Sequence, residues 1–349
     1  MNIAQLVSNI YPVKLRAYNA IYSHVAMLSN ELSRSSGNSV ELYAAGNSEV
    51  NCDLVSVHPQ HMSNGVFSED EKKYYLHLLI SKCFANASKY DIVHSHFNIL
   101  SLFYSNLVTS TPVVNSIHSP IKDELKPIIL QFKNANFISF SLAQRKFLPE
   151  LNWVGNIYHG VDTNVFTFND KPKDYVLFLG RITKDKGVHL AIEAAKKAGI
   201  QIIIAGKSYP NEGYWHDEIE KHVDGKKVRY VGEADFDAKI EYLRNAKALL
   251  MPVQWEEPFG MVMIEAMACG TPVIGFRRGA IPEIVSDKKT GYVVDDVSGM
   301  TKAIKNINKI SREEVRKRAE NFFSVKKMVS GYQKVYKRVI EEYKFKNKK

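Results

Sequence analysis

The feature that most constrains this chain is the alternation of short apolar runs with helical segments between residues 174 and 276. The runs at 174–180 and 201–207 are apolar almost throughout and reach a glycine, which is typical of strands buried on both faces. Between them, apolar residues follow helical spacing until Gly199, a common helix stop. Strands that alternate with helices of this length predict a parallel, doubly wound α/β sheet. Three further strands are expected, at 227–233, 249–253 and 271–276.

The first half of the chain repeats this alternation less regularly. A helix is expected at 22–35, and strands are expected at 2–8, 39–46, 91–97, 112–118 and 136–141. A chain of 349 residues is too long for one ordinary core, and the polar, turn-rich segment 158–174 marks a join. We therefore predict two Rossmann-like domains, at 1–165 and 166–325, followed by a basic helical tail at 326–349.

Composition places the chain among soluble globular proteins. Hydrophobic residues make up 45% and charged residues 24% of the sequence. No stretch approaches the roughly 18 uninterrupted apolar residues of a membrane-spanning helix. The first residues are typical of a strand rather than a signal peptide, because they lack a basic segment and a cleavage site. Three scattered cysteines indicate neither disulfides nor a zinc site, and we expect a cytoplasmic protein.

The formal net charge of +10 is unevenly distributed, because residues 326–349 carry nine Lys or Arg and only two acids. Such a cluster attracts the phosphate groups of nucleic acids, lipids or nucleotides. The same tail carries four aromatic residues, Tyr332, Tyr336, Tyr343 and Phe345. Two interpretations stay open at this point. The tail binds the inner face of an anionic membrane as a peripheral anchor, or its helix packs on the first domain with its lysines in water.

Two carboxylates in the segment "WEEPFGMVMIEAMACGTPVIG" (255–275) require an explanation. Glu265 lies among apolar residues, where an ionised carboxylate is costly unless something hydrogen-bonds it. Glu257 precedes Pro258 and Gly260, which suit a helix start and the close approach of a ligand to the backbone. The helix start favours an anion, and the carboxylates can accept hydrogen bonds from vicinal hydroxyls. The structural alternative is that Glu257 favours the helix dipole and Glu265 caps a buried backbone group.

A basic pair in "GRITKDKG" (180–187) extends the ligand hypothesis. Gly180 closes a strand, Arg181 follows directly, and Lys186 precedes the next helix. Two cations at the carboxyl end of a strand can stabilise the charge that develops on a departing diphosphate. Alone, such a pair is more often part of a solvated loop, but with the two carboxylates it completes a phosphate pocket. Ligands of parallel sheets bind at this edge, so we expect the site in the cleft between the domains.

These segments, together with "GAIPEIVSDKKTGYVV" (279–294), resemble glycosyltransferase family 4, the retaining transferases of the GT-B fold. The Glu-x7-Glu spacing and the following "EAMACGTPVI" are the most specific part, and the resemblance is strong over most of 158–300. The first half resembles the family only in strand order and a few loops. The resemblance implies two Rossmann-like domains with parallel sheets facing across a cleft, and a C-terminal helix that returns to the first domain.

The resemblance also implies residue roles. Arg181 and Lys186, next to Gly180, match the basic pair that holds the donor diphosphate. Glu265 matches the acid that holds the nucleotide ribose, and Glu257 matches the acid that contacts hydroxyls of the transferred sugar. The resemblance further implies that backbone amides at the helix start assist Glu257, namely those of Phe259, Gly260 and Met261.

Histidines at strand ends of the first half supply further candidates. Family members carry a histidine close to the donor sugar, and His118 in "VVNSIHS" (113–119) is the best match, which makes it the fourth predicted catalytic residue after Arg181, Lys186 and Glu257. His96 is the second choice and is expected on the acceptor side. His94 and His159 also stand at strand ends. For each of the four histidines, the alternative is a ring that is hydrogen-bonded to a loop carbonyl.

The chain departs from the family pattern in its first loop. Family members carry a Gly-Gly pair before the first helix, where this chain has Asn19 and Ala20. Asn19 adds a side chain, whereas Ala20 is a small change if its backbone stays out of the positive-φ region. We expect these acceptor-side residues to affect acceptor geometry and activity level rather than the donor site.

A metal site is not expected. The "DFD" at 235–237 could suggest a metal-dependent transferase, but it precedes a helical run that an aspartate would cap. Enzymes of the GT-B fold are generally metal-independent. The resemblance therefore implies a nucleoside-diphosphate sugar as donor substrate, with no metal and no cofactor.

The predicted function is transfer of a hexose from a nucleoside-diphosphate sugar to an acceptor hydroxyl, with retention at the anomeric carbon. The resemblance implies that the diphosphate departs from the face that the acceptor attacks and helps to deprotonate the acceptor. A glycan or lipid-linked acceptor, and a role in cell-envelope polysaccharide or lipopolysaccharide synthesis, are hypotheses from the basic tail and the habits of the family.

Other function classes remain as alternatives. A nucleotide-sugar epimerase of the same fold would need additional first-domain acids and histidines, and a non-enzymatic nucleotide-sugar-binding protein would keep the glutamates without turnover. A nucleic-acid-binding module would need a basic stripe with exposed aromatics, whereas Arg181 and Lys186 are expected to point into a cleft. A dinucleotide oxidoreductase is the weakest alternative, because no G-x-G-x-x-G follows the first strand.

Overall fold

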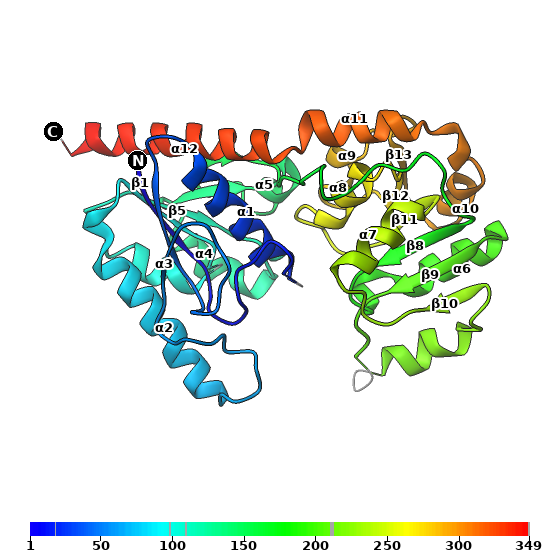
Figure 1. Cartoon of the computed structure of the whole chain (residues 1–349), viewed down its shortest axis with the longest axis horizontal. Helices are drawn as coiled ribbons and strands as arrows, with labels where there is room; N and C mark the ends of the chain where they lie inside the picture. The colour runs from blue at the N-terminus through cyan, green and yellow to red at the C-terminus, as the bar shows by residue number, and fades with distance from the viewer. Residues whose placement is uncertain (18, 98, 109, 210–212, 348–349) are drawn as a thin grey trace. The chain divides into compact units, whose positions relative to one another are not determined.

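The computed structural model describes residues 1–17, 19–97, 99–108, 110–209 and 213–347. The chain divides into two compact units (Figure 1). Unit 1 comprises Met1–Tyr158 and Val325–Lys349, and unit 2 comprises His159–Ser324. The sequence analysis placed the domain boundaries at 165/166 and 325/326. The C-terminal helix thus belongs with the first domain by its contacts, although it follows the second in the sequence.

Unit 1 is built on a seven-stranded parallel sheet with the strand order β3-β2-β1-β4-β5-β6-β7. Its strands are β1 (Asn2–Leu6), β2 (Ser39–Tyr43), β3 (Asp53–Val55), β4 (Ile92–Ser95), β5 (Val113–Ser116), β6 (Asn136–Ser139) and β7 (Trp153–Asn156). Its helices are α1 (Ala20–Arg34), α2 (Glu69–Ala85), α3 (Leu100–Ser105), α4 (Lys126–Leu130), α5 (Leu142–Phe147) and α12 (Val325–Lys346). The strands are short and largely buried, as expected for a parallel sheet that is covered on both faces.

Unit 2 is built on a six-stranded parallel sheet with the strand order β10-β9-β8-β11-β12-β13. Its strands are β8 (Tyr175–Leu179), β9 (Gln201–Ala205), β10 (Val228–Tyr230), β11 (Ala248–Met251), β12 (Val273–Phe276) and β13 (Gly291–Val294). Its helices are α6 (Val188–Ala198), α7 (Phe236–Asn245), α8 (Met261–Ala268), α9 (Ile281–Ile284), α10 (Val297–Lys305) and α11 (Arg312–Phe322). The predicted fold class, two parallel-sheet Rossmann-like domains, is confirmed.

Helix α12 completes the core of unit 1. Apolar residues recur on it at helical spacing, and they pack in one cluster with Ile3, Leu28 and Val114 from the sheet and from α1. Tyr332 and Tyr336 are fully buried in this cluster. The structure therefore favours the packing interpretation of the tail, and these two tyrosines are wrongly assigned to a membrane surface. Of the four aromatic residues in the tail, Phe345 is the exposed one, at 65%.

Each sheet has one place where the order of its strands reverses. In unit 2 the reversal lies between β8 and β11, and in unit 1 it lies between β1 and β4. Ligands of open parallel sheets bind beyond the carboxyl ends of the strands at such a switch point. The loops after β8 and β11 carry most of the donor-site residues predicted from the sequence.

In the part of the chain that the structure describes, no helix is long and apolar enough to span a membrane.

Candidate active site

Three of the predicted site residues in unit 2 surround one tryptophan. The Lys186 Nζ atom donates a hydrogen bond of 2.8 Å to Glu257 Oε2, and Trp255 Nε1 donates to the same oxygen at 3.0 Å. The Lys186 ammonium also lies 4.4 Å from the centroid of the Trp255 ring, and the Arg181 guanidinium carbon lies 5.8 Å from that centroid. Cations within about 6 Å of an indole ring are attracted to its face. Trp255 therefore positions both cations and the carboxylate, a role that the sequence analysis missed.

Backbone geometry holds the two loops of this site together. Lys186 ends a short 3-10 turn, and the following Gly187 has a φ of 73°. A Cβ atom at Gly187 would lie 2.1 Å from the carbonyl oxygen of Pro252, so only glycine fits there. Gln254, in the loop after β11, also bonds to the loop after β8. Its Nε2 donates to the Lys184 carbonyl at 2.6 Å, and its backbone N–H donates to the Asp185 carbonyl at 2.8 Å. The loops after β8 and β11 are thus joined, which brings Lys186 to Glu257.

The ion pair between Lys186 and Glu257 is largely shielded from water. The side chain of Lys186 is 18% exposed and that of Glu257 is 9% exposed. Glu257 gains two hydrogen bonds to one oxygen, which offset the cost of burying its charge. An ammonium has three donors and a carboxylate has several acceptor positions, so both groups retain capacity to bind a ligand. The site can therefore present a cation to a phosphate and a carboxylate to hydroxyls at adjacent positions.

The buried carboxylate of Glu265 has a protein partner. The Lys239 Nζ atom on α7 donates to Glu265 Oε1 at 2.8 Å, and the same ammonium lies 4.9 Å from the Phe236 ring and 5.2 Å from the Phe166 ring. The sequence analysis left open whether an internal group or a ligand satisfies Glu265, and it named a backbone group as the internal alternative. The partner is a lysine side chain, which sequence spacing could not indicate because it lies on a different helix.

The start of α8 differs from the expectation. The helix begins at Met261, three residues after Pro258, and Gly260 occupies the N-cap position with a φ of 84°. A Cβ atom at Gly260 would lie 2.7 Å from the Met263 methyl carbon. The expected amides of Phe259, Gly260 and Met261 do lie at this helix start. The Phe259 side chain is buried and packs edge-on against the ring of His159, at a centroid distance of 4.8 Å.

The histidines predicted in unit 1 form a connected group at the switch point of its sheet. His118 follows β5, and its Nε2 lies 2.9 Å from Nδ1 of His96. His96 in turn bonds to Gln5 Oε1 at 2.8 Å. His94 bonds to the Tyr336 hydroxyl at 2.6 Å and to the Ser116 hydroxyl at 2.8 Å. The partners named here for His94, His96 and His118 are side chains, whereas the structural alternative proposed loop carbonyls.

A further histidine, His24, joins this group from the middle of α1. Its ring centroid lies 5.5 Å from that of His118 and 5.9 Å from that of His96. Burial lowers the pKa of His24 to about 3. Burial also lowers the pKa values of His94 and His118 well below the ordinary value, with smaller contributions from neighbouring histidines. These three rings are therefore neutral at neutral pH, so His118 can serve as a hydrogen-bonding group but not as a cation.

Three of these rings could also hold a metal ion. His24, His96 and His118 each offer a ring nitrogen, and the three nitrogens all lie within 4.8 Å of one another. Three imidazoles form a donor set typical of zinc. The sequence analysis considered cysteines and the "DFD" segment but not this trio, so the absence of a metal stays a prediction. The capping interpretation of "DFD" is confirmed, because Asp235 accepts a hydrogen bond from the Ala238 N–H at the start of α7.

The loop that departs from the Gly-Gly pattern also has a simple local structure. Asn19 is the N-cap of α1, and its side-chain oxygen accepts from the Ile21 N–H at 3.0 Å. Its φ of −86° and the helical position of Ala20 require no glycine. Asparagine is among the preferred N-cap residues. The departure from Gly-Gly therefore creates no backbone strain.

Part of this chain is similar in sequence to known glycosyltransferases. Residues 163–323 match the family model described as glycosyl transferases group 1. An uncharacterized glycosyltransferase from Methanocaldococcus jannaschii is 31% identical over 190 residues, which cover 52% of this chain and 52% of that protein. The matches with the first curated relatives span about half the length of those relatives.

Solved structures match the whole chain at low identity. Sucrose-phosphate synthase from Thermosynechococcus elongatus superposes with a TM-score of 0.78 at 19% identity, covering 98% of this chain and 99% of that one. Anabaena HepE, solved in complex with UDP and glucose, superposes with a TM-score of 0.73 at 16% identity, covering 97% and 100% of the two chains. The chain thus has the GT-B fold, and the part that matches the glycosyl transferases group 1 model, residues 163–323, contains Arg181, Lys186, Glu257 and Glu265.

Proposed function

We propose that this protein is a glycosyltransferase that moves a hexose from a nucleoside-diphosphate sugar to an acceptor hydroxyl with retention of anomeric configuration. The observation that carries the proposal is the arrangement of Lys186, Glu257 and Arg181 around Trp255, at the switch point of the family-matched domain. The complex of Anabaena HepE with UDP and glucose supports a nucleotide-sugar donor.

The proposed mechanism uses exchange of charge partners. A donor diphosphate binds Lys186 and Arg181, so that Lys186 exchanges the Glu257 carboxylate for a phosphate oxygen. Glu257 then accepts hydrogen bonds from hydroxyls of the transferred sugar, while the α8 amides of Gly260 and Met261 assist. As the bond to the anomeric carbon breaks, negative charge grows on the diphosphate, and the two cations stabilise it more than they stabilise the ground state.

Glu265 and the unit 1 histidines complete the proposed site. Glu265 accepts hydrogen bonds from the ribose hydroxyls and exchanges its contact with Lys239 for them. His118 contributes a neutral imidazole near the donor sugar, and His96 orients it through their 2.9 Å contact. The acceptor attacks from the face that the diphosphate leaves, and a diphosphate oxygen takes the acceptor proton.

The acceptor is proposed to be a glycan or a lipid-linked sugar of the cell envelope, synthesised at the inner face of the membrane. The exposed residues Lys344, Phe345 and Lys346 at the end of α12 support a peripheral contact with anionic lipid. A vesicle-sedimentation assay with and without anionic lipid tests this part. Unchanged sedimentation after Lys344→Glu and Lys346→Glu would remove the tail from the proposal.

The decisive experiment is a binding and turnover screen against UDP-, GDP- and ADP-sugars in the presence of EDTA. We expect one nucleotide class to raise the Tm and to be turned over, and Arg181→Ala and Glu265→Ala to abolish both effects. Arg229→Ala is the matched control, because Arg229 is exposed on the edge strand β10 and should change neither effect. If no nucleotide sugar stabilises the wild-type protein, the proposed donor site is wrong.

The screen also separates the alternatives. Donor binding without any turnover would favour a non-enzymatic nucleotide-sugar-binding protein, and conversion of the donor into an epimeric sugar nucleotide would favour an epimerase. Turnover that EDTA abolishes and Zn²⁺ restores would contradict the proposed metal independence and would implicate His24, His96 and His118. Retention is tested by the anomeric configuration of the product in an NMR spectrum.

A further inference from the structure

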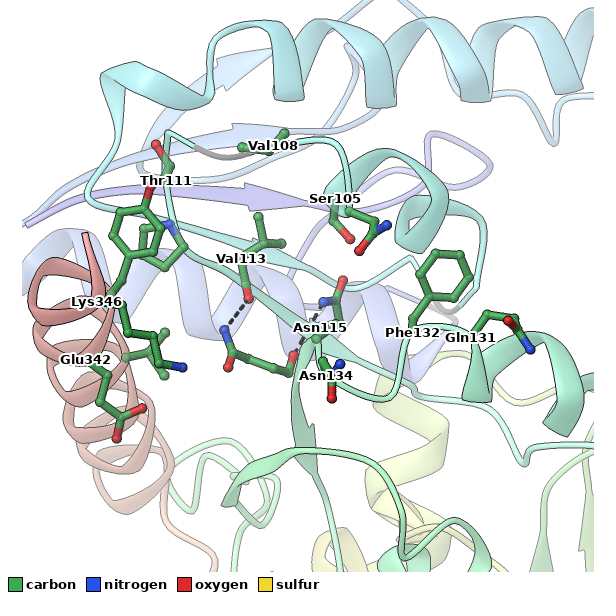
Figure 2. Close-up of a pocket in the computed structure, with 16 residues that line it drawn as sticks. Ser105, Val108, Thr111, Val113, Asn115, Gln131, Phe132, Asn134, Glu342 and Lys346 are labelled. Carbon is green, nitrogen blue, oxygen red and sulfur yellow. Dashed lines mark hydrogen bonds between the residues drawn. The ribbon is translucent and has the colours of Figure 1, made fainter. Parts of the chain in front are cut away.

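A cavity of about 290 Å³ lies in unit 1 (Figure 2). It is lined by residues at the amino ends of β5 and β6, including Pro112 and Asn136, and by the last turns of α12. His118, in contrast, follows the carboxyl end of β5. In a parallel sheet all strands run in the same direction, so their amino ends and their carboxyl ends lie at opposite ends of the sheet. The cavity is therefore separate from the candidate active site.

The lining of this cavity is rich in carboxamide groups. Five side-chain amides contribute to it, those of Asn106, Asn115, Gln131, Asn134 and Asn136. Each amide offers both donors and an acceptor, a pairing that matches the vicinal hydroxyls of a sugar ring. Two aromatic rings, Phe132 and Tyr343, also line the cavity and can pack against the apolar face of such a ring. Gln131 and Asn136 already donate to backbone carbonyls, at 3.4 Å and 3.0 Å, so a sugar would use the donors and acceptors that remain.

One buried amide oxygen in the lining has no hydrogen-bond partner among the described residues. Asn115 is 1% exposed, and its Nδ2 donates to the Asn136 carbonyl at 3.4 Å. Its Oδ1 is unpaired, and Figure 2 shows the side chain between those of Ser105 and Asn134 in this view. Leaving a buried acceptor unsatisfied is energetically costly. A ligand hydroxyl that donates to Oδ1 would recover this cost.

The charge of the lining favours an uncharged ligand. It contains one carboxylate, that of Glu342, and one ammonium, that of Lys346. The two charges balance, so a phosphate or a carboxylate ligand would gain little from the lysine while facing the glutamate. The volume is at the lower end of the range for small-molecule pockets, which suits a single sugar residue.

We infer that this cavity binds a neutral sugar residue, as a saccharide site separate from the candidate active site. The inference rests on the amide-rich lining and on the unpaired Asn115 oxygen, and it holds whether or not the proposed transferase activity is correct. A protein that acts on glycan chains would use such a site to hold a sugar remote from the reacting end.

The experiment is saturation-transfer NMR of the full chain with four neutral probes, the methyl glycosides of glucose, galactose, mannose and N-acetylglucosamine, each with excess UDP, GDP and ADP present. These nucleotides cover the three classes of donor in the screen, and the variants assign the remaining signal to the cavity. We expect saturation of at least one glycoside, and a loss of affinity of about tenfold or more in Gln131→Ala/Asn134→Ala. Both residues are exposed, so this variant should fold.

Asn164→Ala is the matched control, because Asn164 is an exposed asparagine in unit 2 that should not affect the signal. Asn115→Leu tests the unpaired oxygen directly, and we expect binding to be lost with a Tm no lower than that of the wild type. Absence of saturation for all four glycosides, or an unchanged signal in the Gln131→Ala/Asn134→Ala variant, would overturn the inference. Binding of glucose 1-phosphate and inorganic phosphate but of no neutral glycoside would identify an anion site instead and would also overturn it.

Discussion

The two units stabilise the polar side chains near their switch points by different interactions. Unit 1 buries neutral side chains that hydrogen-bond one another, such as His94, Tyr336 and Gln5. Unit 2 places opposite charges together, in the pairs of Lys186 with Glu257 and of Lys239 with Glu265. Both arrangements satisfy groups at the same kind of sheet edge, but by different physical means.

This difference has a consequence for each unit. A neutral group of imidazoles keeps its hydrogen bonds only while the rings stay unprotonated, so it ties the stability of unit 1 to pH. In a pair of opposite charges, a ligand with the same sign as one partner can take that partner's place, so that the other charge keeps a counter-charge. Such pairs therefore suit a binding site. We therefore expect unit 1 to be the acid-sensitive part and unit 2 to be the part in which the proposed charge exchange takes place.

The largest expected effect is acid destabilisation of unit 1. The pKa of His24 is lowered to about 3 in the folded state from 6.5, and the pKa values of His94 and His118 are also lowered. Because the unfolded chain binds more protons below about pH 6.5, stability is full above that pH and falls as the pH drops toward 3. In this window, each such histidine lowers the free energy of unfolding by about 1.4 kcal/mol for every unit by which the pH falls.

Hydrogen exchange followed by mass spectrometry, from neutral pH to about pH 5, measures this loss separately in peptides of each unit. Unit 1 should lose protection first, and His24→Phe should reduce the pH dependence. His77→Phe is the control, because His77 is exposed on α2. Equal acid sensitivity of the two units would contradict the comparison.

The second effect is on catalysis in unit 2. Lys186→Met removes a cation from the proposed diphosphate site, and we expect the rate of sugar transfer to fall about 100-fold or more. The measurement is steady-state turnover of the donor identified in the screen. Lys184→Met serves as the control, since Lys184 is exposed two residues away and should change the rate little. Comparable losses in both variants would show that Lys186 has no special role.

The third effect is on the hydrogen bonds of unit 1. The Tyr336 hydroxyl contacts His94 Nδ1 and accepts from Gln5 Nε2 at 3.1 Å, and all three groups are buried. Tyr336→Phe leaves both partners unsatisfied and should lower the free energy of unfolding by about 1–3 kcal/mol. Denaturant unfolding measures this, with Tyr74→Phe as the control because Tyr74 is 72% exposed. A change within error for Tyr336→Phe would mean that the network adds no stability.

The smallest effect is the coupling between Lys239 and Glu265. Their side chains are 22% and 12% exposed, and we expect a coupling free energy of about 1 kcal/mol in a double-mutant cycle with Lys239→Met and Glu265→Gln. A weak coupling is required if a ribose is to replace the lysine at Glu265. A coupling of several kcal/mol would identify a structural pair and would argue against that exchange.

Much of unit 2 could be predicted from the sequence because its signals are local. Strand β8, helix α6 and the stop at Gly199 follow from apolar runs, helical spacing and a residue that adopts a φ of 73°. Helix α2 was not predicted, and its burial pattern gives the reason. Its buried residues, Leu79, Ile80, Cys83 and Phe84, all lie near its C-terminal end, so most of the helix carries no apolar stripe.

The sequence by itself determined the fold class, the positions of Arg181, Lys186 and Glu257 at strand ends, and the amphipathic character of α12. Only the tertiary structure decided which groups meet: Trp255 beneath both cations, Lys239 against Glu265, and His24 beside His96 and His118. The physical reason is that strand and helix periodicities are properties of neighbouring residues, whereas these partners are brought together by the packing of separate elements. Burial, which lowers the histidine pKa values and leaves Asn115 Oδ1 unpaired, arises only when those elements pack.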